Sequence, residues 1–365
     1  MLGATRNLGH RSLSRDNNFD LLRLIAAALV LVSHSFPLSG HVEPSSTVLG
    51  TTLGGLGVTI FFAISGFLVA RSWFRQPKLK VFVLKRTLRI MPGLMVAAAL
   101  TAFVMGTFFT HLGASEYLSS SGTYAYIAKN WTLLSTNLYL PGVFEDNVYP
   151  DAVNGSLWTL PLEACAYATL AALAFVRVLH RPRAMIGVIA VSLVATSPYM
   201  GLHPSNASVG GIDGSKIELS MQLVATFLMG ATLFLYRDRV LLHPPLFVVV
   251  VAAFLLTGGS DLHVTASILT VPYIVLFLAY WQPSVIARRL TRHGDVSYGM
   301  YIYAFPIQQS VAAAWTGTVP VIAMFALAFP ITYAVAFASW QVVERPALRL
   351  KRRHKDDAGP TPAVD

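Results

Sequence analysis

The chain has 365 residues, of which 55% are hydrophobic and only 12% are charged. A soluble domain carries about 25% charged residues, so this composition and a mean hydropathy of +0.59 exclude an ordinary soluble enzyme and indicate a polytopic membrane protein. The formal net charge of +10 could point to a nucleic-acid partner, but the positions of the charges argue against it. The single cysteine, Cys165, excludes an intramolecular disulfide and a cysteine-based metal cluster. Its apolar neighbours favour a packing role.

A polar, basic N-terminal arm, residues 1–18, is expected to be mobile or to lie on the membrane surface. It is followed by a transmembrane domain, residues 19–345, in which ten apolar segments are candidate membrane helices. We predict them at 19–35, 51–70, 90–110, 156–176, 184–200, 217–236, 245–258, 264–281, 296–315 and 319–342. Residues 111–155 form the one long connection, and residues 346–365 form a basic tail that is expected to be disordered. The predicted fold class is therefore an all-α membrane bundle.

The lysine and arginine residues divide very unevenly between the two sides of this ten-helix topology. All but two of the 27 lie on one side, and the exceptions are Lys129 and Lys216. Cytoplasmic loops are enriched in these residues, so both termini are predicted to be cytoplasmic and residues 111–155 to face outward. Topology thus explains the basic charge, and no nucleic-acid partner is needed.

The first apolar segment, residues 19–35, carries Asp20, Arg23 and His34. In a helix, Arg23 and His34 lie on one face with an offset of about 20°, roughly 16 Å apart along the axis, and Asp20 lies one turn before Arg23. Ionisable groups inside a membrane helix are costly and point to a functional site. Interfacial anchoring of Asp20 and Arg23 is the alternative. A signal peptide is less consistent with the sequence, because no convincing cleavage site follows.

Two arginines directly before the third segment, Arg86 and Arg89, are spaced i,i+3 and share a helical face. Such a pair can bind a phosphate through bidentate hydrogen bonds, although positive-inside placement explains it about equally well. In the second segment, Ser65 lies among glycines that favour close helix packing. Packing is the preferred explanation for Ser65, since no base neighbours it in the sequence.

The fourth segment begins with NGSLWTLPLEACAY and places Glu163 inside the membrane, where a carboxylate needs a partner or a proton. Two interpretations stay open: a structural glutamate paired with an arginine, or a glutamate that orients His34 or contacts a hydroxyl. Pro161 should bend the helix, so the relative facing of Trp158 and Glu163 does not follow from ideal geometry. A neutral His34 could accept the proton of an attacking hydroxyl. We find no metal-ligand spacing, Walker loop or Rossmann fingerprint in the sequence.

Together these segments resemble the membrane acyltransferase-3 family, largely bacterial O-acetyltransferases of surface glycans and some small metabolites. The resemblance covers about residues 19–350 through FDLLRLIAAALVLVSHS, GVTIFFAISGFLV, KRTLRIMP, VNGSLWTLPLE, SYGMYIYAFPIQ and WQVVERPALRL. It implies a ten-helix enzyme that moves an acyl group, usually acetyl, from cytoplasmic acetyl-CoA to a hydroxyl on the outer side of the membrane or within it. One departure is Ala304, where many members have a histidine before the Phe-Pro or Trp-Pro of the ninth segment.

The resemblance also assigns roles to particular residues. The family's motifs fall on Arg23, His34, Arg86, Arg89, Trp158 and Glu163. We therefore expect three groups of site residues. The catalytic group is His34, Glu163 and Asp20. The acyl-CoA-binding group is Arg23, Arg86, Arg89 and Ser65. The acceptor-binding group is Trp158, Asn154, Trp131 and Tyr139. No metal ion is expected, and no fused extracellular hydrolase-like domain is expected after the bundle.

The expected function is that of an acetyl-CoA-dependent O-acetyltransferase of the bacterial inner membrane that acts on a sugar or glycan hydroxyl. The competing class is a transporter or flippase of a glycan or lipid-linked intermediate. Such proteins often carry internal repeats with polar groups in both halves. Here no repeat is detected, and the ionisable residues concentrate in the first four segments. A non-catalytic membrane partner of a glycan-assembly complex stays open, as does the oligomeric state.

Overall fold

The protein is described by a computed structural model that covers residues 6–12, 17–150, 152–197, 214–281, 291 and 294–356. Within this part, seven helices are long and apolar enough to cross a membrane. They are Phe19–Ser39, Leu53–Arg75, Leu79–Phe109, Gly155–Phe175, Lys216–Leu235, His263–Tyr280 and Val321–Leu350. The all-helical, multi-pass membrane fold predicted from the sequence is confirmed.

The count of ten spans stays a prediction. Two of the predicted segments correspond to shorter apolar helices, α9 (Pro182–Ala195) and α11 (Pro244–Leu256). The predicted ninth segment is α14 (Ser297–Ala314), which is not among the seven. Its sequence, SYGMYIYAFPIQQSVAAA, carries tyrosines, glutamines and serines, and most of these side chains are buried. Part of the predicted fifth segment, residues 198–200, lies outside the described residues.

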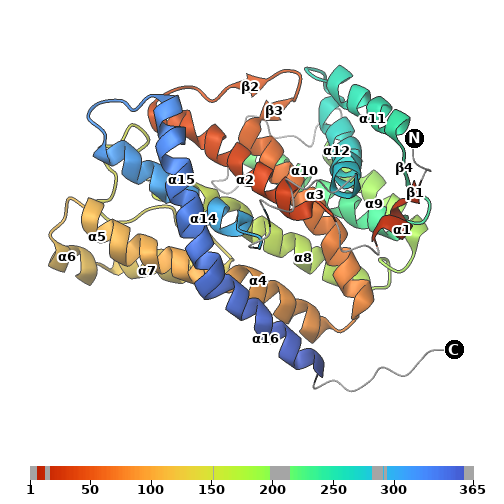
Figure 1. Ribbon diagram of the computed structural model, residues 1–365, viewed down its shortest axis with the longest axis horizontal. Coiled ribbons are helices and arrows are strands. Elements are labelled where there is room, and N and C mark those ends of the chain that lie inside the picture. Colours follow the sequence, from red (N-terminus) through yellow and green to blue (C-terminus); the bar gives the residue numbers. More distant parts are fainter. Residues whose placement is uncertain are drawn as a thin grey trace. The chain divides into compact units, whose positions relative to one another are not determined.

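The chain forms two compact units (Figure 1). The first comprises Met1–Phe36, Val42–Arg75 and Thr159–Gly294, and the second comprises Pro37–His41, Gln76–Trp158 and Asp295–Asp365. Elements of the first unit are β1 (Arg6–Asn7), α1 (Leu8–Ser12), α2 (Phe19–Ser35), β2 (Ser45–Ser46), β3 (Thr51–Thr52), α3 (Leu53–Arg75), α8 (Thr159–Phe175), α9, α10 (Gly214–Leu235), β4 (Leu241–Leu242), α11 and α12 (His263–Tyr280).

Helix α3 is the central element of the first unit, because it packs against α2, α10 and α12 (Figure 1). Glycines allow this close packing. A Cβ atom added at Gly66 would overlap the backbone carbonyl of Phe227 on α10, and one at Gly57 would lie 2.6 Å from the carbonyl oxygen of Ala26 on α2. Small residues let membrane helices approach to this distance. The glycine-rich stretch of the second predicted segment thus has the packing role expected from the sequence.

The N-terminal arm is more ordered than the sequence indicated. Strand β1 pairs antiparallel with β4, and the amide of Leu8 donates to the carbonyl of Val240 at 2.8 Å. The side chain of Leu8 is fully buried. Of the two expected alternatives, a mobile arm does not fit residues 6–12, because the apolar Leu8 and the backbone groups beside it find partners more than 200 residues away in the sequence. A position on the membrane surface stays a prediction.

The second unit contains η1 (Pro37–Ser39), α4 (Leu79–Leu100), η2 (Thr101–Met105), α5 (Gly106–Phe109), α6 (Ala114–Ser119), α7 (Ser121–Thr132), η3 (Gly155–Trp158), α14, α15 (Val321–Ser339), η5 (Trp340–Glu344) and α16 (Arg345–Asp356). Helix α14 packs against α15 and α4.

Two π-helical turns, η2 and η5, interrupt long helices, and such turns are frequent at functional sites. The tail was expected to be disordered from residue 346, but it is helical as α16 up to Asp356. A helix that continues from an existing one avoids the unfavourable nucleation step of helix formation.

The long connection between the third and fourth predicted segments has a core of its own. Helices α6 and α7 cover it, and the hydroxyl of Tyr117 donates to the carbonyl of Ala102 at 2.7 Å. Burial raises the pKa of Tyr117 to about 12, partly offset by its contact with Thr123. A tyrosine hydroxyl is protonated at neutral pH in any case, and the raised pKa keeps this donor protonated at alkaline pH as well. This segment is a structured cap rather than a flexible loop.

Candidate active site

Helix α2 is fixed at both of its ends. At the start, the side-chain amide of Asn18 donates to the carbonyls of Leu278 and Trp281, both at 3.0 Å. Near the other end, the hydroxyl of Ser33 accepts a hydrogen bond from the amide of Gly54 on α3 at 2.8 Å. Arg23 lies between these anchors and the predicted catalytic His34 directly follows the second, so both are held on a rigid element, which favours a preorganised site.

Two charged residues near the start of α2 form an ion pair that was not predicted from the sequence. A guanidinium nitrogen of Arg23 lies 3.0 Å from a carboxylate oxygen of Asp20, and the two side chains are 19% and 46% exposed. His34 lies eleven residues further along the same helix, partly buried, between two buried serines. The exposed Asp20 compensates the Arg23 charge only weakly, so Arg23 can still attract an anionic ligand.

Glu163 lies in the first turns of α8 and is partly buried. Its carboxylate accepts a hydrogen bond from the hydroxyl of Tyr167, one helical turn later. A hydroxyl, in the same helix, is therefore one partner of this carboxylate. The i,i+4 spacing of the two residues was a signal that the sequence already contained. The suggested role of Glu163 toward His34 stays a prediction.

Two other predicted residues of the first unit have different surroundings. Ser65 is partly buried on α3, directly before Gly66, the glycine in closest approach to α10. Cys165 on α8 is exposed, so the packing role expected for it is wrong. In a membrane helix an exposed side chain of this kind faces lipid or solvent rather than the protein interior.

In the second unit, Arg89 is the centre of a polar cluster. Its guanidinium lies 2.5 Å from the carboxylate of Asp295, whose side chain is only 9% exposed. The same carboxylate accepts from the hydroxyl and the amide of Ser297 at the start of α14. The Arg89 guanidinium also lies over the ring of Tyr298, 5.8 Å from its centroid, and the Tyr298 hydroxyl donates to the carbonyl of Ile90 at 2.7 Å. These contacts tie α4 to α14.

A second buried carboxylate, Glu344, lies in the π-helical turn η5 and is 2% exposed. It accepts a hydrogen bond from the hydroxyl of Ser339 at 3.2 Å, and Ser339 lies 3.4 Å from the hydroxyl of Tyr303 on α14. Neither Glu344 nor Asp295 was predicted to have a role. Glu344 lies two residues past the predicted tenth segment, and the signal that the sequence offered for it was its place in the stretch WQVVERPALRL, one of those that carry the family resemblance.

The two arginines of the Arg-x-x-Arg motif therefore differ in their surroundings. Arg89 has a carboxylate partner that is almost fully buried, so a phosphate would have to compete with Asp295 for it. Arg86 lies one turn earlier and is partly buried. The neighbouring Lys85 donates to the side chain of Gln76 at 2.8 Å. Sequence spacing alone treats Arg86 and Arg89 as equivalent.

The predicted acceptor-binding residues all lie in the second unit. Asn154 is 1% exposed; its amide donates to the carbonyl of Ile302 at 2.9 Å and its oxygen accepts from the amide of Ser156 at 3.2 Å. Trp131 packs against the hydrophobic core that contains Tyr117 and Tyr126. Tyr139 is 58% exposed, and Trp158 is partly buried at the end of η3.

Gln309 on α14 is a structural residue that the sequence analysis did not single out. Its side-chain amide donates to the carbonyls of Ala152 at 2.6 Å and Tyr149 at 2.9 Å, and its oxygen accepts from Asn147 at 2.7 Å. Together with the bond from Asn154, these contacts hold the segment before η3 against α14. Among the residues that the structure describes, no group of three or more His, Cys, Asp or Glu side chains could hold a metal ion.

The fold and these residues define an integral membrane protein with an imidazole, guanidinium groups and carboxylates on its apolar helices. Comparison with known proteins gives the family. The family model of the acyltransferase domain matches residues 16–341. The chain is 30% identical over 339 residues to an O-acetyl transferase of Shigella phage Sf6, covering 91% of this chain and 96% of that protein. It is also 30% identical over 373 residues to nodulation protein 10 of Rhizobium leguminosarum bv. viciae, covering 94% and 95%. No solved structure matches.

The chain therefore belongs to the acyltransferase-3 family, which confirms the resemblance seen in the sequence, and it is a multi-pass membrane O-acyltransferase.

Proposed function

We propose that this protein transfers an acetyl group from cytoplasmic acetyl-CoA to a hydroxyl of a sugar or glycan on the outer side of a bacterial inner membrane. The observation that carries the proposal is the placement of Arg23 and His34 on α2, a helix fixed at both ends. The relative named O-acetyl transferase supports the acetyl group. The uneven division of lysine and arginine supports a cytoplasmic donor side.

In the proposed reaction, His34 acts as the general base. The acceptor oxygen attacks the thioester carbonyl carbon, and its proton passes to His34. The carbon–sulfur bond then breaks, and the CoA sulfur takes the proton from the imidazolium, which restores the neutral ring. Glu163 supports the imidazolium or positions the acceptor, and Asp20 holds Arg23 through the observed ion pair. A variant of this scheme has His34 carry the acetyl group transiently.

The remaining predicted residues have binding roles in this proposal. Arg23 and Arg86 attract the phosphates of the donor, with Ser65 as a further donor-binding candidate. Arg89 becomes a positioning residue, because its charge is compensated by Asp295. Trp158, Trp131 and Tyr139 offer aromatic faces to a sugar, and Asn154 supports the segment that carries Trp158.

The test is acetyl transfer by membranes that carry His34→Ala. With isotopically labelled acetyl-CoA and a glycan extract, we expect the rate to fall at least about a hundredfold at unchanged protein level, since general-base catalysis contributes that much. His10→Ala, an exposed histidine of α1, is the control and should keep full activity. Full activity of His34→Ala would remove His34 from the mechanism. Glycan movement without acetyl transfer by the unmodified protein would instead support the transporter alternative.

A further inference from the structure

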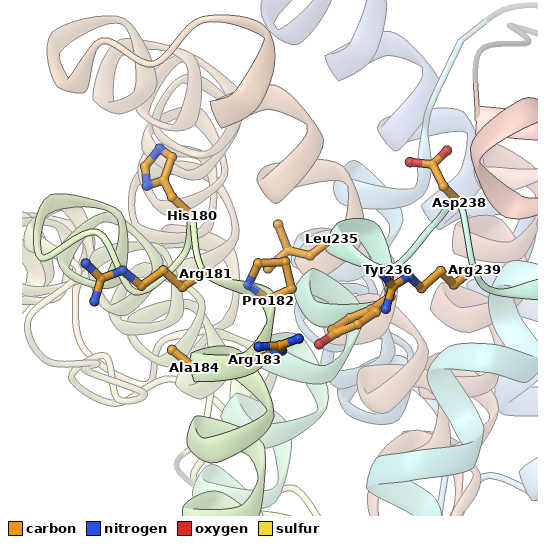
Figure 2. Close-up of a pocket in the computed structure, with 9 residues that line it drawn as sticks. All are labelled: His180, Arg181, Pro182, Arg183, Ala184, Leu235, Tyr236, Asp238 and Arg239. Atoms are coloured by element: carbon orange, nitrogen blue, oxygen red, sulfur yellow. The ribbon is translucent and has the colours of Figure 1, made fainter.

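The first unit contains a cleft of about 730 Å³ where α9 begins and α10 ends (Figure 2). This size falls in the range of small-molecule sites, about 300–1,000 Å³. The polar side chains that line it are His180, Arg181, Arg183, Tyr236, Asp238 and Arg239. None of them belongs to the catalytic or binding groups assigned above.

The cleft is strongly cationic. Three guanidinium groups line it against a single carboxylate, Asp238. That carboxylate lies 3.8 Å from Arg237, which is not among the lining residues. Arg237 is otherwise engaged, since it donates to the carbonyl of Phe234 at 3.1 Å and lies over that ring. The positive charge of the lining arginines is therefore left for a ligand, and clustered arginines match the geometry of phosphate.

The side chains converge on one part of the cleft. In Figure 2, Arg183 and Arg239 both extend toward Tyr236, whereas Arg181 and His180 lie on the opposite side. Arg183 is the second residue of α9, so the first turn of this 14-residue helix starts in the same place. The partial positive charge of a helix N-terminus adds to the attraction for an anion. A lining that combines an aromatic ring with guanidinium groups suits a nucleotide, which offers both phosphates and a flat base.

A series of aromatic contacts connects the cleft to the start of α2. The ring centroids are 5.4 Å apart for His180 and Phe74, 5.8 Å for Phe74 and Phe234, 5.5 Å for Phe234 and Phe67, and 6.1 Å for Phe67 and Phe19. Phe19 is the first residue of α2. The cleft therefore lies at the end of the first unit where Arg23 is found, with His34 about 16 Å further along the helix.

We propose that this cleft binds phosphate groups and that its ligand is the nucleotide end of the acyl-CoA donor. The inference rests on the proposed function. Arg183 and Arg239 bind the ribose 3′-phosphate beside Tyr236, the 5′-diphosphate lies toward Arg23, and the pantetheine arm extends from there toward His34. The headgroup of an anionic phospholipid carries the same phosphate chemistry, so the experiment must separate the two sources.

The experiment measures the affinity of the purified full chain for CoA and for pantetheine, which lacks the nucleotide. The protein is held in phosphatidylcholine nanodiscs, which carry no anionic lipid. We expect Arg183→Gln and Arg239→Gln each to weaken CoA binding about tenfold, because one hydrogen-bonded charge contributes that much. Pantetheine binding should not change. Arg177→Gln is the matched control: it removes the same charge from an exposed position of the same connection outside the cleft lining.

Three results would overturn the inference. One is wild-type CoA affinity in the Arg183→Gln/Arg239→Gln double variant, and another is an equal loss in Arg177→Gln. The third is that the double variant keeps CoA binding but no longer binds phosphatidylglycerol. Bound lipid is detected by native mass spectrometry after reconstitution with phosphatidylglycerol. That result would mean that the cleft binds a lipid headgroup. Failure of the unmodified chain to bind CoA would overturn the proposed function as well. His34→Ala should keep CoA affinity while losing transfer, so the two proposals are tested separately.

Discussion

Asp295 controls the charge balance of the polar cluster in the second unit. It is 9% exposed and accepts from the Arg89 guanidinium and from the amide and hydroxyl of Ser297. A buried charge is tolerated when it is paired and hydrogen-bonded. Removal of one partner leaves the other uncompensated, and the energetic cost arises mainly from that remaining charge. This residue therefore reports whether Arg89 is structural or binds a ligand.

Asp295→Asn should lower the free energy of unfolding by about 3 kcal/mol, the lower end of the cost of breaking a buried ion pair. The Arg89→Gln/Asp295→Asn double variant should lose less than the sum of the two single changes, because neither charge is then left unpaired. Chemical unfolding of the purified protein in detergent measures both quantities. Asp146→Asn is the control, since its ion pair with His111 is exposed and should contribute little. Strict additivity would mean that Arg89 and Asp295 do not act as a pair.

His263 shows how surroundings separate a structural histidine from a candidate catalytic one. It is 6% exposed, and its two ring nitrogens lie 2.7 Å from the carbonyl of Leu49 and 3.3 Å from the hydroxyl of Thr257. One ring nitrogen thus holds the connection at Gly50, which has a positive φ of 58°, and the other contacts the residue that ends α11. The sequence places His263 at a span edge, and only the tertiary contacts give it this role.

At the scale of the elements, the glycines of α3 and α10 decide how closely these helices pack. An added Cβ at Gly66 would overlap the carbonyl of Phe227, and one at Gly230 would overlap the carbonyl of Ala63. The two positions are reciprocal, each glycine facing the backbone of the other helix. Backbone atoms cannot move aside as a flexible side chain can, so a methyl group must push the helices apart.

Gly66→Ala and Gly230→Ala should each lower the free energy of unfolding by about 1–3 kcal/mol through overpacking. Gly187→Ala on α9 is the matched control, because an added Cβ there meets nothing within 4 Å. Alanine has the higher helix propensity, so the control should be stabilising by up to about 1 kcal/mol. Thermal unfolding in detergent distinguishes the opposite signs. Destabilisation of Gly187→Ala by the same amount would contradict the packing argument.

Local signals predicted the elements well and distant contacts poorly. The first predicted segment, 19–35, coincides with α2, and the i,i+3 spacing of Asp20 and Arg23 placed them one turn apart, as the structure has them. The third was predicted to begin near residue 90, but α4 begins at Leu79, because charged residues in the first turns of a helix look like a loop in the sequence. The pairing of β1 with β4 and of Arg89 with Asp295 joins residues more than 200 positions apart, and no local pattern encodes it.

At the scale of the whole molecule, charge and hydropathy describe the same topology from independent properties. Seven helices among the described residues are long and apolar enough to cross a membrane, and the lysines and arginines divide consistently only if further segments cross as well. Helix α14 is the critical case. Its polar side chains lower its hydropathy, yet most of them are buried against protein, where they do not meet lipid. A helix of this kind can cross a membrane inside a bundle.

Cysteine mapping should therefore place the connection between α14 and α15 on the outer side. The experiment uses a Cys165→Ala background, because Cys165 is exposed and would itself react. In right-side-out vesicles, a membrane-impermeant maleimide should label Glu116→Cys on α6 and Thr316→Cys after α14. Arg177→Cys should react only after the membrane is opened, because it lies on the basic side. All three positions are exposed in the structure, so protection would report the membrane and not burial. Protection of Thr316→Cys together with labelling of Glu116→Cys would show that α14 or another segment between the two positions does not cross as predicted. The ten-helix topology would then be wrong, and with it the cytoplasmic assignment of the residues that follow α14.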